Sequence, residues 1–188
     1  VWGITADLTK NFEERNFETR LFLKSKNPFK INRELKKALL SKKENTIFHI
    51  HGGWIPIFYS ISKVLHSNQI NFVFTPHGAY NTIAMKRNFW IKKLYFQLFE
   101  KTVLKNSKKI HHIGKSESTG LSHFFKNNKT VLLPYGFENT IKPELCSTKN
   151  KDIVFGFIGR LDIYTKGLDT LLLAFEQVIT QFPNAKLW

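Results

Sequence analysis

Arg160 and Lys166 have types and spacing that suit the binding of an anion. Each lies beside a glycine in the stretch FIGRLDIYTKGLD, between an apolar run and a predicted helix. Arginine offers a planar fork of hydrogen-bond donors, and a helix that begins near Gly167 adds unpaired N–H groups and a partial positive charge. Gly159 permits a sharp turn and a close approach of the backbone. Together these features predict a site for a diphosphate.

A surface ion pair is the alternative role for Arg160. Asp162 and Asp169 are both close enough in sequence for a carboxylate to pair with the guanidinium. Spacing alone leaves both interpretations open.

Further histidines and glycines follow the ends of predicted strands. FHIHGGW, with His49 and His51, and TPHGAY, with His77, each close a short β-rich run, as do LLPYGFE and FIGR. Open parallel sheets bind ligands beyond the carboxyl ends of their strands. Four such endings predict a common cleft.

His49 and His51 are also candidate metal ligands, because residues two apart on a strand point the same way. Structural zinc sites have four ligands and catalytic ones three and a water, yet no cysteine or carboxylate stands near this pair in sequence. We therefore expect no metal. His111 and His112 lie inside another strand pattern and are expected to be structural.

The elements that must position these residues alternate between short β-rich runs and longer helical patterns. This alternation predicts an α/β fold of parallel βαβ units with helices on both faces of the sheet. A polar stretch without periodicity at residues 135 to 152 predicts a linker. After it come the strand IVFGFIG and a helix with four apolar residues on one face: Leu168, Leu171, Leu172 and Phe175.

The stretch GRLDIYTKGLDTLLLAF resembles the Gly-Arg-Leu-x-x-x-Lys-Gly-x-Asp-x-Leu-Leu-x-Ala-Phe segment of family 4 glycosyltransferases. The resemblance extends back through LLPYGFE, TPHGAY and FHIHGGWIP in the expected order and covers most of residues 46 to 188. It implies the GT-B fold, in which two Rossmann-like domains with parallel sheets face a cleft. The implied parts are an acceptor-binding domain at 1 to 140, a linker at 141 to 151 and the start of a nucleotide-sugar-binding domain at 152 to 188.

The resemblance also implies a reaction and roles for residues. A sugar would move from a nucleotide-diphosphate sugar to an acceptor hydroxyl, with retention and without metal or cofactor, in bacterial polysaccharide or lipid-linked glycan synthesis. Arg160 and Lys166 match the catalytic pair that binds the donor's diphosphate, and His77 matches a catalytic histidine near the donor sugar. The other matched positions are Gly136 and Gly159 on the donor side and His51, Gly52, Gly53 and Gly78 on the acceptor side.

The sequence departs from the family pattern at several points. Tyr135 stands where the family usually has Asn, and Thr119 where a second acidic residue often occurs. The family's Glu-x7-Glu signature would lie beyond Trp188, and its first strand is missing because VWGITAD resembles the second. We therefore expect a fragment that is inactive alone.

A formal charge of +15 points to a polyanionic partner, either nucleic acid or an anionic membrane surface. Residues 86 to 130 hold eleven Lys or Arg against Glu100 and Glu117, a local net charge of +9. Codon drift in an AT-rich genome is the alternative explanation. A basic nucleic-acid-binding module is an alternative function, although no RNP-like or zinc-finger spacing occurs.

The helix expected from about Asn88 to Lys105 also has two interpretations. One is a core-facing apolar side with a solvated basic side, the apolar residues being Phe89, Trp90, Leu94, Leu98 and Val103. The other is a helix on an anionic membrane surface, which would also suit a non-catalytic membrane-associated GT-B relative.

Two features bear on location. No apolar run approaches the roughly 18 residues of a membrane span. The single Cys146 cannot form an internal disulfide, which is compatible with a reducing compartment. We expect a cytoplasmic protein that lies peripherally on the inner face of the plasma membrane.

Overall fold

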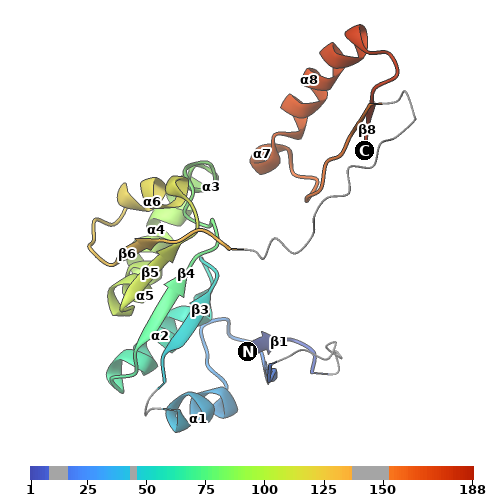
Figure 1. The fold of residues 1–188 in the computed structure, drawn as a ribbon. Coiled ribbons are helices and arrows are strands. Elements are labelled where there is room, and N and C mark those ends of the chain that lie inside the picture. The colour runs from blue at the N-terminus through green and yellow to red at the C-terminus, as the bar shows by residue number, and fades with distance from the viewer. Residues whose placement is uncertain (9–16, 43–45, 137–152) are drawn as a thin grey trace. The chain divides into compact units, whose positions relative to one another are not determined.

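The computed structural model describes residues 1–8, 17–42, 46–136 and 153–188 (Figure 1). The chain divides into two compact units, Val1–Tyr135 and Gly136–Trp188. The linker predicted at 141 to 151, and with it Cys146, lies outside the described residues.

Unit 1 has an α/β fold in which all paired strands are parallel. Its elements are β1 (Trp2–Thr5), β2 (Arg20–Leu23), α1 (Arg33–Ser41), β3 (Phe48–His51), α2 (Pro56–Ser67), β4 (Phe72–Thr75), α3 (Thr82–Lys86), α4 (Phe89–Tyr95), the π-helix η1 (Phe96–Glu100), α5 (Lys101–Asn106), β5 (Lys109–His112), α6 (Lys115–Ser122) and β6 (Thr130–Leu132). β1 pairs with β2, and the other strands form a sheet in the order β3-β4-β5-β6. The predicted α/β class with parallel sheets is confirmed.

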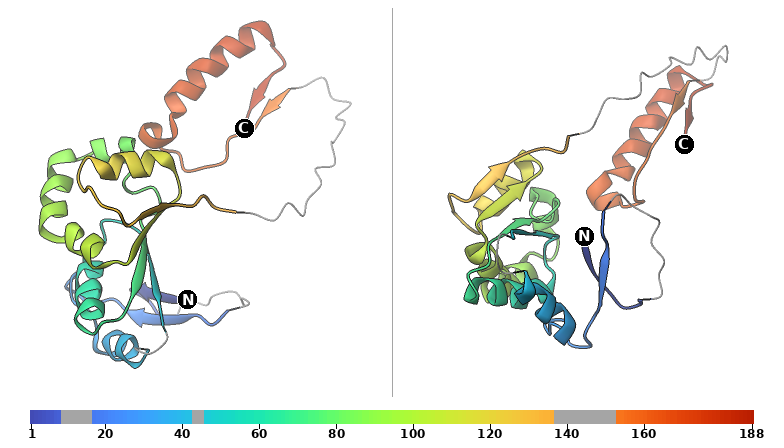
Figure 2. Two further views of the ribbon diagram at one scale, coloured as in Figure 1. Left: turned by 60° about the vertical axis from the view of Figure 1, so that its left-hand side comes forward. Right: turned by 60° about the horizontal axis from the view of Figure 1, so that its bottom comes forward.

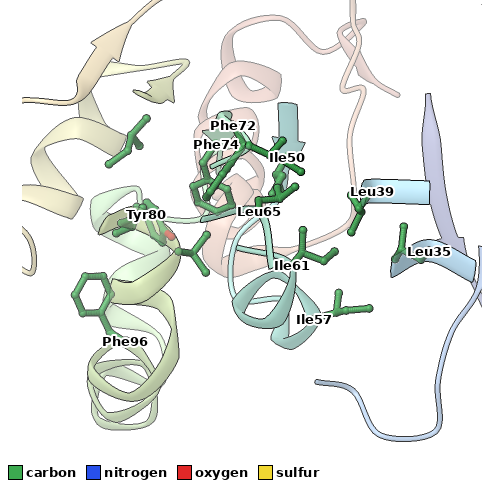
Figure 3. Packing of buried hydrophobic residues seen from close by; sticks show 14 of the residues in the cluster. Leu35, Leu39, Ile50, Ile57, Ile61, Leu65, Phe72, Phe74, Tyr80 and Phe96 are labelled. Carbon is green, nitrogen blue, oxygen red and sulfur yellow. The ribbon is translucent and has the colours of Figure 1, made fainter. Parts of the chain in front are cut away.

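The four-stranded sheet has one buried face. Phe72 and Phe74 of β4 are fully buried, and the core that they join extends through α2 to α1 on one side and to Tyr80 and Phe96 on the other (Figure 3). Because the strands are paired in chain order, right-handed crossovers place α2, the α4 to α5 segment and α6 on the same face. The prediction of helices on both faces is therefore wrong for this sheet within the described residues.

A cavity of about 570 Å³ lies between the β1–β2 sheet and β3. Its walls are mainly apolar and include Trp2, Leu35, Leu39 and Phe48, and the rings of Trp2 and Phe48 are 5.5 Å apart. Among the described residues, neither β1 nor β3 has a strand partner on this side.

The helix predicted from Asn88 to Lys105 exists as the contiguous segment α4, η1 and α5, drawn in light green along the outer side of unit 1 (Figure 2). The prediction that its listed apolar residues face the core is wrong except at Val103, which is fully buried. The segment carries two apolar stripes, and the one that contains Phe96 and Val103 packs into the core. The other stripe is exposed.

Unit 2 contains β7 (Val154–Phe155), α7 (Ile163–Lys166), α8 (Leu168–Gln181) and β8 (Lys186–Leu187), with β7 and β8 parallel. Leu171 and Phe175 of α8 are half-buried, and Phe175 contacts Phe155 of β7. Leu172, predicted on the same face, is 61% exposed. One residue turns a helix by about 100°, so Leu172 lies beside the packed stripe, which continues to Val178 instead.

None of the helices in the described part of the chain combines the length and the apolar character that a membrane span requires.

Gly120 allows a direct test of the packing of α6 against the loop that follows β4. A Cβ atom at this position would lie 1.9 Å from the backbone oxygen of Tyr80. Urea denaturation of Gly120→Ala should show a loss of about 1–3 kcal/mol in the free energy of unfolding, because the backbone must shift to admit the methyl group. Thr119→Ala, at an exposed position of the same helix, is the control. Equal stability of Gly120→Ala and wild type would contradict this packing.

Candidate functional site

The loops at the carboxyl ends of β3 and β4 meet, as the sequence predicts. His51 closes β3 and His77 follows β4, and His51 Nδ1 lies 2.7 Å from His77 Nε2. Gly53 lies against the second loop, where an added Cβ would be only 2.7 Å from the Cβ of Ala79. The structure therefore brings His77 together with all four acceptor-side positions, namely His51, Gly52, Gly53 and Gly78.

The loop after β4 is a tight turn with an unusual backbone. His77 has φ 53° and Gly78 has φ 79°, and the Ala79 N–H donates to the Pro76 oxygen at 3.2 Å. Two successive positive φ values are those of a type I′ turn. Histidine is one of the few residues enriched in the left-handed region, which accounts for the pair His-Gly at this point.

The carboxylate of Glu117, on α6, holds this turn in place. Oε1 accepts a hydrogen bond from the Gly78 N–H at 2.6 Å, and Oε2 accepts one from the Ile113 N–H at 3.3 Å. A backbone hydrogen bond from Tyr80 adds to these. Glu117 is almost completely buried, and burial raises the pKa of its carboxyl group while the backbone N–H groups oppose the rise.

Glu100 performs a similar role between two loops. Its Oε1 accepts hydrogen bonds from the Trp54 N–H at 3.0 Å and from the Tyr80 hydroxyl at 2.6 Å. Burial raises the pKa of this carboxyl group as well. Glu100 ends the π-helix η1, a kind of helical irregularity that often occurs at functional sites. Two buried carboxylates thus connect the loops after β3, β4 and β5.

His77 also forms the middle of a hydrogen-bonded row across the sheet edge. Its Nε2 faces His51, and its Nδ1 is hydrogen-bonded to the Tyr135 hydroxyl, which follows β6. A neutral imidazole has one donor and one acceptor nitrogen, so this row can be satisfied in either direction. Tyr135, where the resemblance leads one to expect Asn, therefore contributes a hydroxyl that is hydrogen-bonded to His77.

A second row lies beside the first. His49 Nε2 is 2.6 Å from Thr75 Oγ1, which is 3.0 Å from His111 Nδ1, and His111 Nε2 donates to the Leu133 oxygen at 2.6 Å. With a neutral His111 ring the direction is fixed, because the carbonyl can only accept. His111, expected to be purely structural, is thus part of the polar edge.

The clustered imidazoles disfavour one another's protonation. Partial burial and the charge of neighbouring histidines lower the pKa values of His49, His51 and His77 below the usual 6.5. At neutral pH these three rings therefore present uncharged donors and acceptors. Such groups suit the hydroxyls of a polar, uncharged ligand part.

The donor-side positions lie in unit 2, apart from Gly136 at the unit boundary. Arg160 and Lys166 are exposed, and an added Cβ on Gly159 would lie 3.8 Å from Lys166 Cε. The Asp162 carboxylate accepts hydrogen bonds from the N–H groups of Tyr164 and Thr165, at 3.0 and 3.2 Å, and so caps α7. α8 begins at Leu168, where the sequence predicts a helix N-terminus.

No cluster of three or more His, Cys, Asp or Glu side chains suited to a metal ion occurs in the described ranges. His49 and His51 are instead engaged with Thr75 and His77.

Sequence reasoning missed the residues that support the site. Neither Glu100 nor Glu117 was predicted to support the site, although an acid at the end of the apolar run YFQLFE is an indication of a buried carboxylate. Thr75 and Tyr135 carry no pattern of their own. Their roles depend on which strands are neighbours.

Comparison with known proteins does not identify the chain, since no family model, no curated protein and no solved structure matches it.

The role of Glu117 leads to a test by isosteric substitution. Glu117→Gln keeps the shape but turns an NH2 group toward either the Gly78 or the Ile113 N–H, so one backbone donor loses its acceptor. Chemical denaturation should show a loss of about 1–3 kcal/mol, and hydrogen exchange should become faster at the Gly78 or the Ile113 amide. Thr119→Ala is again the control. Unchanged exchange at both amides, together with unchanged stability, would show that the carboxylate does not hold the turn.

His112 gives a prediction for pH dependence. It is fully buried, its Nδ1 contacts Ser118 Oγ at 2.8 Å, and its Nε2 has no hydrogen-bond partner in the part of the chain described. Burial, with a smaller effect of His111, lowers its pKa to about 4. Between pH 6.5 and 4 the unfolded chain binds the extra proton, so stability falls as pH falls.

The measurement for His112 is the difference in unfolding free energy between wild type and His112→Gln at pH 7 and pH 4.5. We expect the advantage of wild type to shrink at pH 4.5. Titration of the buried Glu100 and Glu117 occurs in both proteins and largely cancels. His66→Gln, at an exposed position of α2, is the control. A constant difference would contradict the lowered pKa.

Proposed function

We propose that the chain is part of a GT-B glycosyltransferase that moves a sugar from a nucleotide-diphosphate sugar to an acceptor hydroxyl. The single observation that carries the proposal is the meeting of His51 and His77, 2.7 Å apart, at the carboxyl edge of a parallel sheet. Ligands of open α/β sheets bind at this edge. The motifs that supply both histidines, FHIHGGWIP and TPHGAY, resemble those of family 4 glycosyltransferases, and this resemblance suggests sugar transfer as the reaction.

The histidine edge suits contact with sugar hydroxyls. His51 and His77 are uncharged at neutral pH, so each can donate with one nitrogen and accept with the other. The turn that carries His77 is fixed by Glu117 and needs no rearrangement to present the ring. Under the proposal, His77 orients the donor sugar, and the loop with Gly52 and Gly53 forms a wall for the acceptor.

Arg160 and Lys166 would stabilise the leaving diphosphate. Both are exposed, and a Cβ added at Gly159 would lie 3.8 Å from Lys166 Cε and 3.1 Å from the Phe157 ring. The N-terminus of α8 follows immediately at Leu168 and adds a partial positive charge. Negative charge that builds up on a departing diphosphate is stabilised most by such preorganised donors. The retaining course of the reaction and its place in bacterial glycan synthesis are proposed from the resemblance alone.

Binding of UDP and GDP tests the donor half of this proposal. Isothermal titration calorimetry should show that one of them binds better than its monophosphate, because a second phosphate adds charge for Arg160 and Lys166. Arg160→Ala and Lys166→Ala should each weaken binding at least tenfold, or about 1.4 kcal/mol. Lys186→Ala removes the same charge from the same unit and is the control.

Two results would count against the transferase. Equal affinity of Arg160→Ala, Lys166→Ala and wild type for the diphosphates would remove the role of both residues. Steeply salt-dependent binding of DNA, without binding of UDP or GDP, would favour a nucleic-acid-binding module instead.

A further inference from the structure

The α4 to η1 segment carries an exposed stripe that the proposed function leaves unexplained. The stripe consists of Trp90 (75% exposed), Ile91 (71%), Leu94 (63%) and Leu98 (54%). We call these four residues the apolar stripe. Positions spaced by four residues lie on the same side of a helix, so the stripe forms one ridge.

The segment that carries the apolar stripe is firmly packed on its other side. Phe96 is fully buried and contacts Phe124, and Tyr95 packs against Trp54 and Phe99. The stripe is therefore a fixed surface and not the result of a loosely attached helix. Isolated exposed apolar residues are ordinary, but a contiguous ridge of four marks an interaction surface.

Cations flank the apolar stripe, and the surrounding segment of residues 86 to 130 exposes no acid. Lys86, Arg87, Lys93 and Lys105 are exposed, and Lys93 Nζ lies 5.2 Å from the centre of the Trp90 ring. The only acids between residues 86 and 130 are Glu100 and Glu117, and both are buried. All of the solvent-facing charge in this region is therefore positive.

We propose that the apolar stripe docks this chain onto the surface of a lipid membrane with anionic headgroups. A helix that lies in the interface plane inserts its apolar residues at the headgroup boundary, while flanking Lys and Arg contact anionic lipid. Tryptophan is enriched at this depth, and Trp90 is the most exposed member of the stripe.

The charge of the surface argues against the other occupants. A second copy of the chain would bring two surfaces of the same sign together, each from a molecule with net charge +15. Nucleic acid would satisfy the cations but would leave aliphatic Ile91, Leu94 and Leu98 without an apolar partner. Of these three occupants, only a lipid surface provides both anionic groups and hydrocarbon. This inference does not depend on the glycosyltransferase proposal.

Vesicle co-sedimentation of the full chain tests the apolar part. Vesicles contain phosphatidylcholine with about one third phosphatidylglycerol, or phosphatidylcholine alone. The wild type should bind the anionic vesicles, and Trp90→Ala/Leu94→Ala should bind them at least tenfold less well. The matched control is Leu23→Ala/Ile47→Ala, since those side chains are 49% and 69% exposed elsewhere in unit 1. All four positions are exposed, so circular dichroism should show unchanged folding.

A charge-matched comparison tests the electrostatic part. Lys86→Gln/Lys93→Gln/Lys101→Gln and Lys24→Gln/Lys26→Gln/Lys30→Gln remove the same total charge from different places. Only the first variant should lose at least tenfold in binding to anionic vesicles. Tryptophan fluorescence of the wild type should shift to the blue on vesicle binding, and Trp90→Phe should lose most of this shift while it still binds.

Three outcomes would overturn the membrane inference. Equal losses for the two lysine variants would mean that binding follows net charge alone. Equal binding by Trp90→Ala/Leu94→Ala and wild type would mean that the stripe does not insert. Concentration-dependent dimers that this double variant abolishes, without vesicle binding by the wild type, would assign the stripe to self-association.

Discussion

The buried carboxylate of Glu117 is the interaction on which the candidate site depends. It accepts hydrogen bonds from the N–H of Gly78, in the loop after β4, and from the N–H of Ile113, in the loop after β5. A buried acceptor with several donors is costly to disturb, because each donor that it releases stays buried without a partner. The left-handed backbone of His77 can persist only because the neighbouring contacts hold it.

The one-sided packing of the four-stranded sheet gives this edge its chemical character. Alternate residues of β3 and β5 point away from the core, so Ile50 and Ile110 are buried while His49 and His111 meet through Thr75 on the other face. Partial burial and the charge of neighbouring histidines lower the pKa values of His49, His51 and His77. These three rings are therefore uncharged at neutral pH, although the protein as a whole is strongly basic.

Acidic and basic side chains occupy different environments in part of this protein. In the region around α4 to α6, the acids are inside as structural acceptors and the cations are outside. A composition with few acids would produce a basic surface under any fold, but the burial of Glu100 and Glu117 leaves that surface without counter-charge. Beside it, the segment exposes one of its two apolar stripes, and the combination gives the surface its affinity for anionic lipid in our proposal.

The sequence by itself determined the kinds of element and much of their order. The alternation of short β-rich runs with helical patterns predicted the parallel α/β unit. The rule that ligand-binding residues follow the carboxyl ends of parallel strands predicted that His51 and His77 would share a cleft. Only the tertiary structure decided which stripe of the α4 to α5 segment packs, that Val178 and not Leu172 extends the packed face of α8, and that helices cover one face of the sheet. It also decided the partners of Glu100, Glu117 and Tyr135. These choices depend on which distant residues become neighbours, and a hydrogen bond between residues 39 or 58 positions apart leaves no trace in local spacing.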